Sequence, residues 1–307
     1  MVLLALATAC GGDDGETAKA KGAGGASGTG GGGGTGGILM IDGGGNSDGA
    51  AGTGGGLSFP IGPDGYPVGF TKTDEGARKL GDPFDGTPPK QSNCGSVLLG
   101  VVRDFKDGSK GGHPDFETFT GDGLKGIVED TLGSDQKPVY ASNGPTIYTT
   151  GKTEFDQWYR NTDGINKPYL IFFFLVPNGG VYTFESNAFF PLDDAGWGNE
   201  GHPHNFHFTT EVHTKFKYNG GETFRFQGDD DLWVFINDKL AIDLGGLHAK
   251  QTQQIDLDTA ASSLGISPGN VYSLALFHAE RHTDESNFRI DTNLEFVDCG
   301  TTVPEPR

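Results

Sequence analysis

Basic residues are scarce in this 307-residue sequence, with 22 Lys and Arg against 41 Asp and Glu and a net charge of −19. Such a field repels phosphate backbones and anionic lipid headgroups, which argues against nucleic acid or a charged membrane surface as a partner. No aromatic residue occurs before Phe59, and the apolar run at residues 1–9 is short. Since a membrane span needs ~20 apolar residues, this run does not predict a transmembrane helix.

Glycine is abundant instead, and much of it lies in residues 11–56. A segment of this composition buries too little apolar surface to offset the entropy lost on ordering, so we expect a disordered Gly-rich tether. A glycine-rich fibre segment is the alternative, but the sequence has no strict repeat. Residues 57–93 are rich in Pro and Gly and are expected to form an extended lead-in to the folded domain.

The N-terminal residues 1–10 read MVLLALATAC, an apolar run followed by small residues and Cys10. This pattern resembles a bacterial signal and lipoprotein junction, in which the thiol of Cys10 would carry lipid. Two features depart from that pattern: no basic residue precedes the run, and Leu6 stands four rather than three residues before the cysteine. The alternative is an ordinary secretory signal peptide with an incidental cysteine.

Once Cys10 is set aside, Cys94 and Cys299 are the two remaining cysteines, and they bracket nearly all the aromatic sequence. In an exported protein we expect a disulfide between them, with two free buried thiols as the alternative. The folded domain is therefore predicted to span residues 94–299, and residues 300–307 form a tail.

Within these limits the sequence predicts an all-β fold. Residues 207–218 alternate strictly between two faces, which is typical of a half-buried antiparallel strand, and Asn219-Gly220 favours a tight turn after it. The runs 170–176 and 232–236 are apolar throughout, as in strands covered on both sides. Only residues 153–160 show helical spacing. We therefore expect an antiparallel β-sandwich or barrel with one short helix.

Three adjacent carboxylates, Asp229, Asp230 and Asp231, stand immediately before the apolar run 232–236. They repel one another, so a loop that holds them together needs a counter-charge such as Ca²⁺, which takes six to eight oxygen ligands. Asp243 is a possible additional ligand on chemical grounds alone. A solvated acidic turn is the alternative interpretation.

The context of the triplet, GDDDLWVFINDKLAIDLGGLH, resembles the fibro-slime domain, a relative of the protective-antigen-type carbohydrate-binding sandwich. Further matching stretches occur in order between Cys94 and Cys299: HPDFE, FDQWYRN, FFPLDDAGWG, HNFHFTTEVHTKFKY and FHAERHTDESNFRIDTNLEF. The resemblance implies export to a cell surface or extracellular matrix. It also implies that Asp229 and Asp230 hold calcium, with Asn287 and then Asp284 as further ligands. Asp231 stands where many relatives have glycine.

Tryptophan and histidine are two further residue types that could contribute to a site. Trp197 lies in a loop without apolar neighbours in sequence, so its ring is a candidate ligand-binding platform or a side chain folded back over the domain edge. The histidines fit no close zinc spacing: His207 and His213 share a strand face but lie six residues apart, about 20 Å. We therefore expect polar structural histidines and no zinc site.

Together these features predict an exported binding module that is lipid-anchored at the cell surface or outer membrane, or secreted. Its expected partner is polysaccharide or a matrix glycan, with membrane contact only through the lipid anchor and with Ca²⁺ as cofactor. A structural matrix or adhesion protein with purely structural calcium and no glycan site is the main alternative. We do not expect an enzyme: no GxSxG motif is present and no carboxylate pair has a recognisable acid/base context, which leaves a polysaccharide-cleaving enzyme as a weaker hypothesis.

Overall fold

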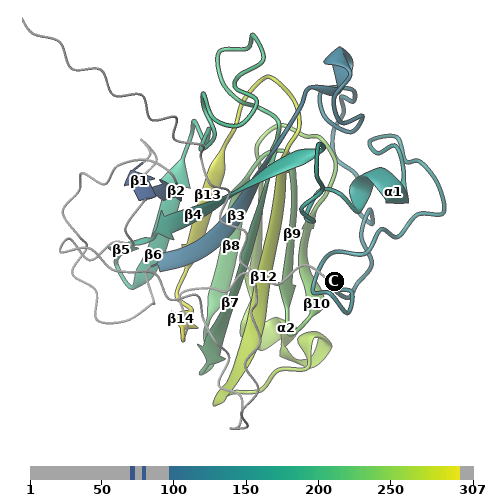
Figure 1. The fold of residues 1–307 in the computed structure, drawn as a ribbon. Coiled ribbons are helices and arrows are strands. Elements are labelled where there is room, and N and C mark those ends of the chain that lie inside the picture. The colour runs from purple at the N-terminus through teal and green to yellow at the C-terminus, as the bar shows by residue number, and fades with distance from the viewer. Residues whose placement is uncertain (1–69, 73–77, 81–96, 298–307) are drawn as a thin grey trace, which may run out of the picture. The chain divides into compact units, whose positions relative to one another are not determined.

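The computed structural model describes residues 70–72, 78–80 and 97–297. The predicted tether and Cys10, Cys94 and Cys299 lie outside the described residues. Within the described range the chain forms two antiparallel β-sheets (Figure 1), so the predicted all-β sandwich is confirmed.

The larger sheet has nine strands in the order β1-β2-β4-β3-β7-β12-β9-β10, and β14 pairs with β7. The bounds are β1 Phe70–Lys72, β2 Arg78–Leu80, β3 Val97–Phe105, β4 Asn166–Phe174, β7 Phe208–Tyr218, β9 Asp231–Ile236, β10 Lys239–Leu244, β12 Asn270–Glu280 and β14 Glu295–Phe296. β2 pairs with β4. The segment expected as an extended lead-in therefore contributes two short strands to this sheet.

The smaller sheet has five strands in the order β11-β8-β13-β6-β5. Their bounds are β5 Val176–Asn178, β6 Val181–Ser186, β8 Thr223–Gly228, β11 Gln251–Asp256 and β13 Phe288–Thr292. The turn at Asn219-Gly220 connects β7 of the larger sheet to β8 of the smaller one, so the predicted turn is present but joins the two layers.

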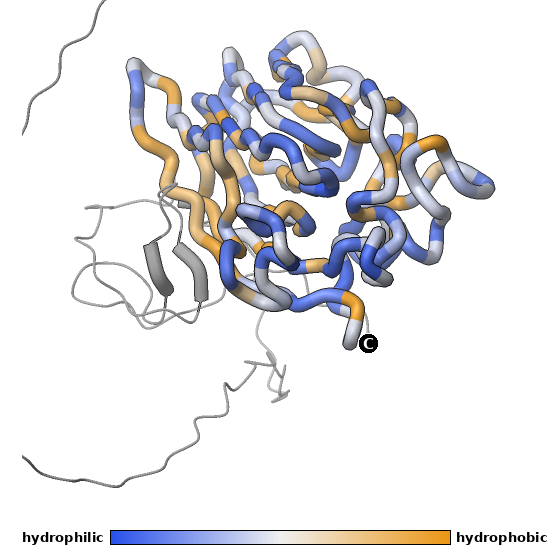
Figure 2. The backbone as a smooth tube through the Cα atoms, turned by 90° about the horizontal axis from the view of Figure 1, so that it is seen from above, coloured by the Kyte–Doolittle hydropathy of each residue, from blue (hydrophilic) through white to orange (hydrophobic). Residues whose placement is uncertain are grey.

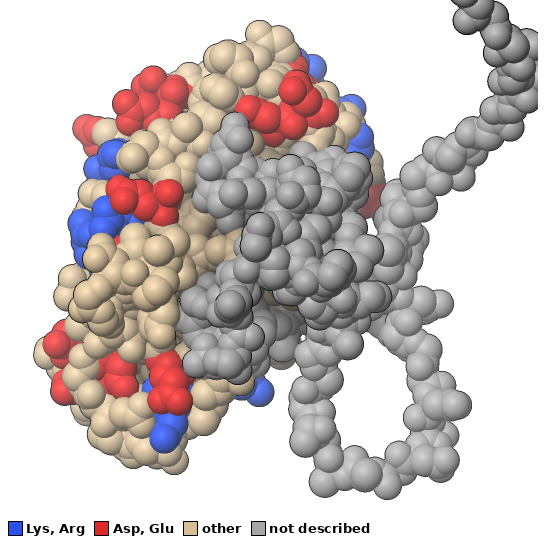
Figure 3. Space-filling model, turned by 90° about the vertical axis from the view of Figure 1, so that its left-hand side faces the viewer, with Lys and Arg blue, Asp and Glu red and all other residues tan. Residues whose placement is uncertain are grey.

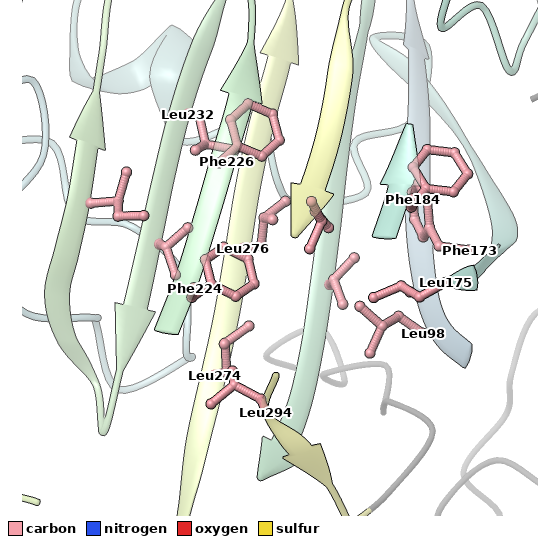
Figure 4. Close-up of a cluster of buried hydrophobic side chains, with 14 of the residues drawn as sticks. Leu98, Phe173, Leu175, Phe184, Phe224, Phe226, Leu232, Leu274, Leu276 and Leu294 are labelled. Atoms are coloured by element: carbon pink, nitrogen blue, oxygen red, sulfur yellow. The ribbon is translucent and has the colours of Figure 1, made fainter. Parts of the chain in front are cut away.

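The main core fills the space between the sheets. Leucine and phenylalanine side chains from both layers point into it (Figure 4), including Leu98 and Phe173 from the larger sheet and Phe184, Phe224 and Phe226 from the smaller one. Figure 2 shows hydrophobic and hydrophilic residues interspersed along the backbone, with some longer hydrophobic stretches. Alternate residues of strands such as β4, β9 and β12 supply this core, as the period of two requires.

A second core lies on the opposite face of the larger sheet, beneath residues 106–165, which we call the cover segment. Trp233, Phe235 and Phe277 project from the sheet and pack with Phe155 and Trp158 of the cover segment. This explains why residues 232–236 are buried on both faces, as predicted. It also corrects the prediction for β7, which is buried on both faces over most of its length because the cover segment lies on its polar face.

Two α-helices and one 3-10 helix, Gly108–Lys110, occur among the described residues. α1, Lys152–Phe155, begins one residue before the predicted helix 153–160 and overlaps it only at 153–155. α2, Leu257–Leu264, was not predicted from the sequence, although Asp256 caps its first turn through Thr259 N and Gly265 ends it in a left-handed conformation. Neither helix is long or apolar enough to span a membrane.

Candidate functional site

The acidic residues singled out in the sequence lie at one end of the sandwich, where three connections meet. Asp229 and Asp230 join β8 to β9, and their peptide bond is cis. The connection from β12 to β13 contributes residues 281–287, and the connection from β10 to β11 contributes His248. Because neighbouring strands are antiparallel, the end of β12 and the start of β13 fall beside the β8–β9 junction.

Asn287 holds the carboxylate of Asp229. The Asn287 backbone N–H donates to Oδ1 at 2.6 Å, and its side-chain amide donates to Oδ2 at 2.8 Å. Asp229 is only 4% exposed, and burial raises its pKa although both Asn287 hydrogen bonds oppose that effect. The Asn287 amide nitrogen faces Asp229, which leaves its carbonyl oxygen as a potential ligand atom.

Asp230 and Asp231 turn to different environments although they are adjacent. Asp230 accepts a hydrogen bond from the Arg281 backbone at 3.1 Å, and burial raises its pKa to about 8 against the opposing charge of Arg281. Asp231 pairs through Oδ2 with Arg281 Nε at 2.6 Å, and both side chains are fully buried. Asp231 therefore balances a buried guanidinium, whereas Asp230 forms no such salt bridge with any residue that the structure describes.

Glu280 is a further acidic residue that the sequence reasoning missed. It is 1% exposed, and neither carboxylate oxygen has a hydrogen-bond partner among the described residues. Burial raises its pKa well above its usual value, and the nearby Asp230 and Asp229 raise it further. Ser286 and the His282 backbone partly offset this rise but do not meet Glu280 in hydrogen-bond geometry.

The alternation of β12 contained a signal for this residue. Leu274 and Leu276 belong to the core between the sheets, and Glu280 falls on the same face by the period of two. A glutamate at an inward position of a strand requires a positive charge, a proton or a bound cation.

An open hollow of about 380 Å³ lies over Asp229 and Asp230. Asp122 of the cover segment lines it together with His248, His282, Asp284 and Glu285. A second hollow of about 520 Å³ shares Asp284 and Glu285 with the first. The site thus combines two buried carboxylates with an acidic rim and an opening large enough for a small polar ligand.

The residues present fit a hard cation. Carboxylates of Asp229, Asp230 and Asp284 and the carbonyl oxygen of Asn287 are oxygen donors of the kind Ca²⁺ takes. The unpartnered carboxylate of Glu280 adds negative charge behind them. Four of the five residues predicted as metal ligands are thus brought to one place.

Asp243, the fifth predicted ligand, is held elsewhere. Its Oδ1 accepts hydrogen bonds from Trp233 Nε1 at 3.0 Å and from Gly245 N at 3.1 Å. Its Oδ2 accepts one from Gly126 N at 2.8 Å. Asp243 does not line either hollow; it fixes the buried indole of Trp233 and ties the cover segment to β10.

Trp197, the predicted ligand platform, also lies outside both hollows. Its half-buried ring faces two ammonium groups, with Lys167 Nζ at 4.4 Å and Lys106 Nζ at 5.1 Å from the ring centroid. Its backbone N–H donates to Asp104 Oδ2 at 2.7 Å. The structure therefore gives this ring cation–π contacts within the domain.

Charge on the visible surface is divided among small patches. Figure 3 shows acidic and basic side chains in separate groups on one face, without a continuous basic field.

Comparison with known proteins supports the predicted sandwich for part of the chain. Residues 185–306 match the family model of the PA14 domain. This range includes the β8–β9 junction, β12 and Asn287. The match agrees with the protective-antigen-type sandwich implied by the sequence resemblance. The narrower fibro-slime assignment is not matched.

Proteins of the social amoeba Dictyostelium discoideum are similar over a longer range. Protein psiR is 38% identical over 225 residues, covering 67% of this chain, and protein psiC is 36% identical, covering 64%. The matched part spans 22% of psiR and 42% of psiC, so the chain corresponds to less than half of either relative.

Two solved structures cover most of the described part of the chain at low similarity. One is a PA14 sugar-binding domain from an RTX adhesin, 9% identical with a TM-score of 0.31, covering 68% of this chain and 99% of that domain. The other is the PA14 domain of the MpAFP antifreeze protein, 10% identical with a TM-score of 0.29, covering 72% of this chain and 98% of that domain.

Proposed function

We propose that this chain is an exported binding module that recognises polysaccharide or a matrix glycan with the help of Ca²⁺, and that it is not an enzyme. In this proposal lipid on Cys10 anchors it at the cell surface or outer membrane, or cleavage of a secretory signal releases it. The Gly-rich segment 11–56 would then hold the domain away from the surface.

One observation carries the proposal: Asp229 and Asp230 lie side by side beneath an open hollow, with the unpartnered carboxylate of Glu280 behind them. Close, buried carboxylates are unfavourable without a counter-ion. Calcium bound there would neutralise them and offer its remaining coordination positions to sugar hydroxyl groups.

Some residues of the chain would orient the two aspartates, and others would contact the ligand. Asn287 fixes Asp229 through two hydrogen bonds, and the Arg281 backbone fixes Asp230. The rim carboxylates of Asp284 and Glu285 are hydrogen-bond acceptors for hydroxyl groups of a sugar in the hollow. This arrangement selects a polyhydroxylated, uncharged or cationic ligand and disfavours an anionic one.

A second function, a structural matrix protein with enclosed calcium and no glycan site, is favoured by the burial of both carboxylates. Asp229 is 4% exposed and Asp230 is 7% exposed. A cation held by two such groups could be surrounded by protein oxygens and leave no position for a sugar.

A glycan array separates the two functions. The full chain is applied with excess Ca²⁺ and with chelator, beside Asp230→Asn and the control Asp163→Asn, which removes an equal charge from an exposed residue that lines neither hollow. We expect calcium-dependent glycan binding by the native chain and Asp163→Asn, and none by Asp230→Asn.

The other results would each count against the proposal. Stabilisation by calcium without glycan binding would select the structural function. Glycan binding that persists in chelator would remove calcium from the mechanism. Release of soluble sugar from a bound polysaccharide would show that the chain is an enzyme after all.

A further inference from the structure

A second polar cluster lies between the cover segment and the loop that leads into β7. The cluster consists of Asp107, His202 and His207. Each residue offers one potential ligand atom, and the three atoms all lie within 4.8 Å of one another. Asp107 is fully buried and His207 is 2% exposed. No zinc-binding motif is visible in the sequence here, because Asp107 lies about a hundred residues before both histidines.

The hydrogen bonds around His207 determine which ring nitrogen faces the cluster. Nε2 lies 3.0 Å from Glu117 Oε2, and Thr283 donates to both oxygens of that carboxylate. Because Thr283 donates to both of its oxygens, Glu117 is placed to accept a hydrogen bond from the His207 Nε2–H, which leaves the Nδ1 lone pair directed away from it.

The Nδ1 atom faces further negative charge. It lies 3.6 Å from Glu200 Oε2, which itself accepts a hydrogen bond from Asp107 N at 2.7 Å. A lone pair opposite a carboxylate oxygen is unfavourable unless a proton or a metal cation lies between or beside them. The orienting carboxylate on the far nitrogen is the arrangement commonly found behind metal-bound histidines.

An ammonium group lies beside two of the three residues of the cluster. Lys110 Nζ lies 2.9 Å from Asp107 Oδ2 and 2.8 Å from His202 Nε2. Since an ammonium can only donate, His202 Nε2 presents a lone pair to it.

We propose that Asp107, His202 and His207 form a binding site for a divalent transition metal of the zinc type, distinct in chemistry from the oxygen-lined calcium site. The two imidazole nitrogens are donors that zinc prefers and calcium does not, and zinc also binds the carboxylate oxygen that completes the set. Lys110 occupies the site in the metal-free protein, and its side chain, 47% exposed on a long flexible stem, swings out when metal enters. Glu117 is the positioning residue behind His207.

The geometry requires a small adjustment. Zinc ligands at about 2.0–2.1 Å from the metal stand roughly 3.3 Å apart in a tetrahedron, somewhat closer than the largest separation here. His202 lies on a half-exposed loop and can close that gap, with solvent as the fourth ligand. The metal would fasten the cover segment to the loop before β7.

The test is isothermal titration of the full chain with ZnCl₂ in buffer containing excess Ca²⁺, so that the calcium site is filled. We expect one zinc per chain. His202→Ala and Glu117→Gln should weaken zinc binding at least roughly tenfold, as loss of a ligand or of its orienting partner does. Lys110→Ala should strengthen binding, because it removes the competing ammonium.

Two controls show where zinc binds. His204→Ala removes a neighbouring histidine that bonds to Asp193 and lies outside the cluster, and Asp230→Asn alters the calcium site. Neither should change zinc affinity. Co²⁺ added in place of Zn²⁺ should give visible absorption characteristic of imidazole ligation in the native chain, and His202→Ala should lose it.

Three results would overturn the proposal. Absence of zinc binding in the native chain would overturn the site outright. Equal affinity in His202→Ala would place zinc elsewhere, and loss of zinc in Asp230→Asn would place it in the calcium hollow. Binding by Lys110→Ala alone would make the ammonium the permanent occupant.

Discussion

At the scale of single residues, neighbouring carboxylates have opposite roles. Asp230 lies beneath the hollow with a pKa raised to about 8 by burial, whereas Asp231 is fully buried against Arg281. Arg281 also donates to the backbone oxygens of Asp115 and Tyr148 at 2.9 Å, so the Asp231–Arg281 pair ties the sheet to the cover segment. Asp230 is thus available to a ligand, whereas Asp231 stabilises the fold.

This difference predicts distinct effects for two substitutions one residue apart. Asp230→Asn should change unfolding free energy in chelator by about 1 kcal/mol or less, yet abolish the response to Ca²⁺, which at ten times Kd is about 1.4 kcal/mol. Asp231→Asn should cost about 3–5 kcal/mol, because it leaves a buried guanidinium without its carboxylate. Denaturant unfolding with and without Ca²⁺ measures both.

The outcome for Asp231→Asn also bears on the metal assignment. If the variant folds, its calcium response should be retained, since Asp231 faces Arg281 and not the hollow. An unchanged response in Asp229→Ala and Asp230→Asn, together with a lost response in Asp231→Asn, would contradict the proposed ligand set.

The buried carboxylate of Glu211 makes the free energy of unfolding depend on pH. Glu211 on β7 bonds Arg103 Nη1 at 2.7 Å and Lys137 Nζ at 2.6 Å. Burial raises its pKa, but the charge of Arg103 and the His213 hydrogen bond outweigh that effect and bring it below 4.5. A lowered pKa in the folded state means that Glu211 stabilises the fold above pH 4.5 and that this contribution is lost as pH falls.

Glu211→Gln should therefore destabilise the protein by about 3–5 kcal/mol at neutral pH, because it removes the carboxylate shared by two buried cations. The difference from the native chain should shrink as pH decreases below 4.5. Thermal unfolding of both proteins across this range measures it. A pH-independent difference would show that the loss comes from packing and not from charge.

At the scale of elements, the cover segment and the sandwich are two layers that share one sheet. Trp158 connects them: its ring is fully buried, its Nε1 donates to Asp115 Oδ2 at 3.0 Å, and Arg281 lies 4.6 Å from its centroid. Thr209 of β7 also donates to its backbone oxygen at 2.6 Å. Trp158 thus joins the cover segment to the sheet through ring packing and buried hydrogen bonds, at the centre of the second core.

Trp158→Ala should cost about 3–5 kcal/mol, the usual effect of deleting a buried aromatic side chain. Amide hydrogen exchange should show loss of protection mainly in residues 106–165, while strands that supply the core between the sheets stay protected. Phe226→Ala, which empties that core, serves as the matched comparison and should affect both sheets. Equal loss of protection throughout in both variants would show that the two layers unfold as one unit.

At the scale of the whole molecule, the paths of β3 and β14 bear on the predicted disulfide. β12 runs along the full length of β7, so β3 and β14 share the other edge of that strand. Gly100 of β3 pairs with Val212, and Val297 N bonds Lys215 O at 2.8 Å. These described parts of β3 and of the chain after β14 therefore meet β7 at positions three residues apart, while Cys94 and Cys299 themselves lie outside the described residues.

Peptide mapping without reductant should recover Cys94 joined to Cys299, and reduction should lower the unfolding free energy by up to about 5 kcal/mol for a closed loop of this length. The Cys94→Ser, Cys299→Ser double variant should match the reduced protein and should not respond to reductant. Two alkylatable thiols in the folded, oxidised protein would contradict the pairing.

Local sequence patterns were enough to predict the β-rich character of the domain, the strands at 207–218 and 232–236, and a concentration of negative charge at the triplet Asp229, Asp230 and Asp231. These rest on local information: the period of two, turn residues, and adjacent like charges that need a counter-ion. The short helix at 257–264 could have been found from its caps but was overlooked. Composition alone also set the acidic charge that disfavours nucleic acid.

Which polar residues come into contact depends on the tertiary fold. Glu280 joins Asp229 and Asp230 because β12 ends beside the β8–β9 junction, and Asp243 is taken up by Trp233 across a strand pair. His202 and His207 meet Asp107 because the cover segment returns to the start of β7. Such contacts depend on strand order and on how the segment 106–165 lies across the sheet, and neither is encoded in the spacing of residues along the chain.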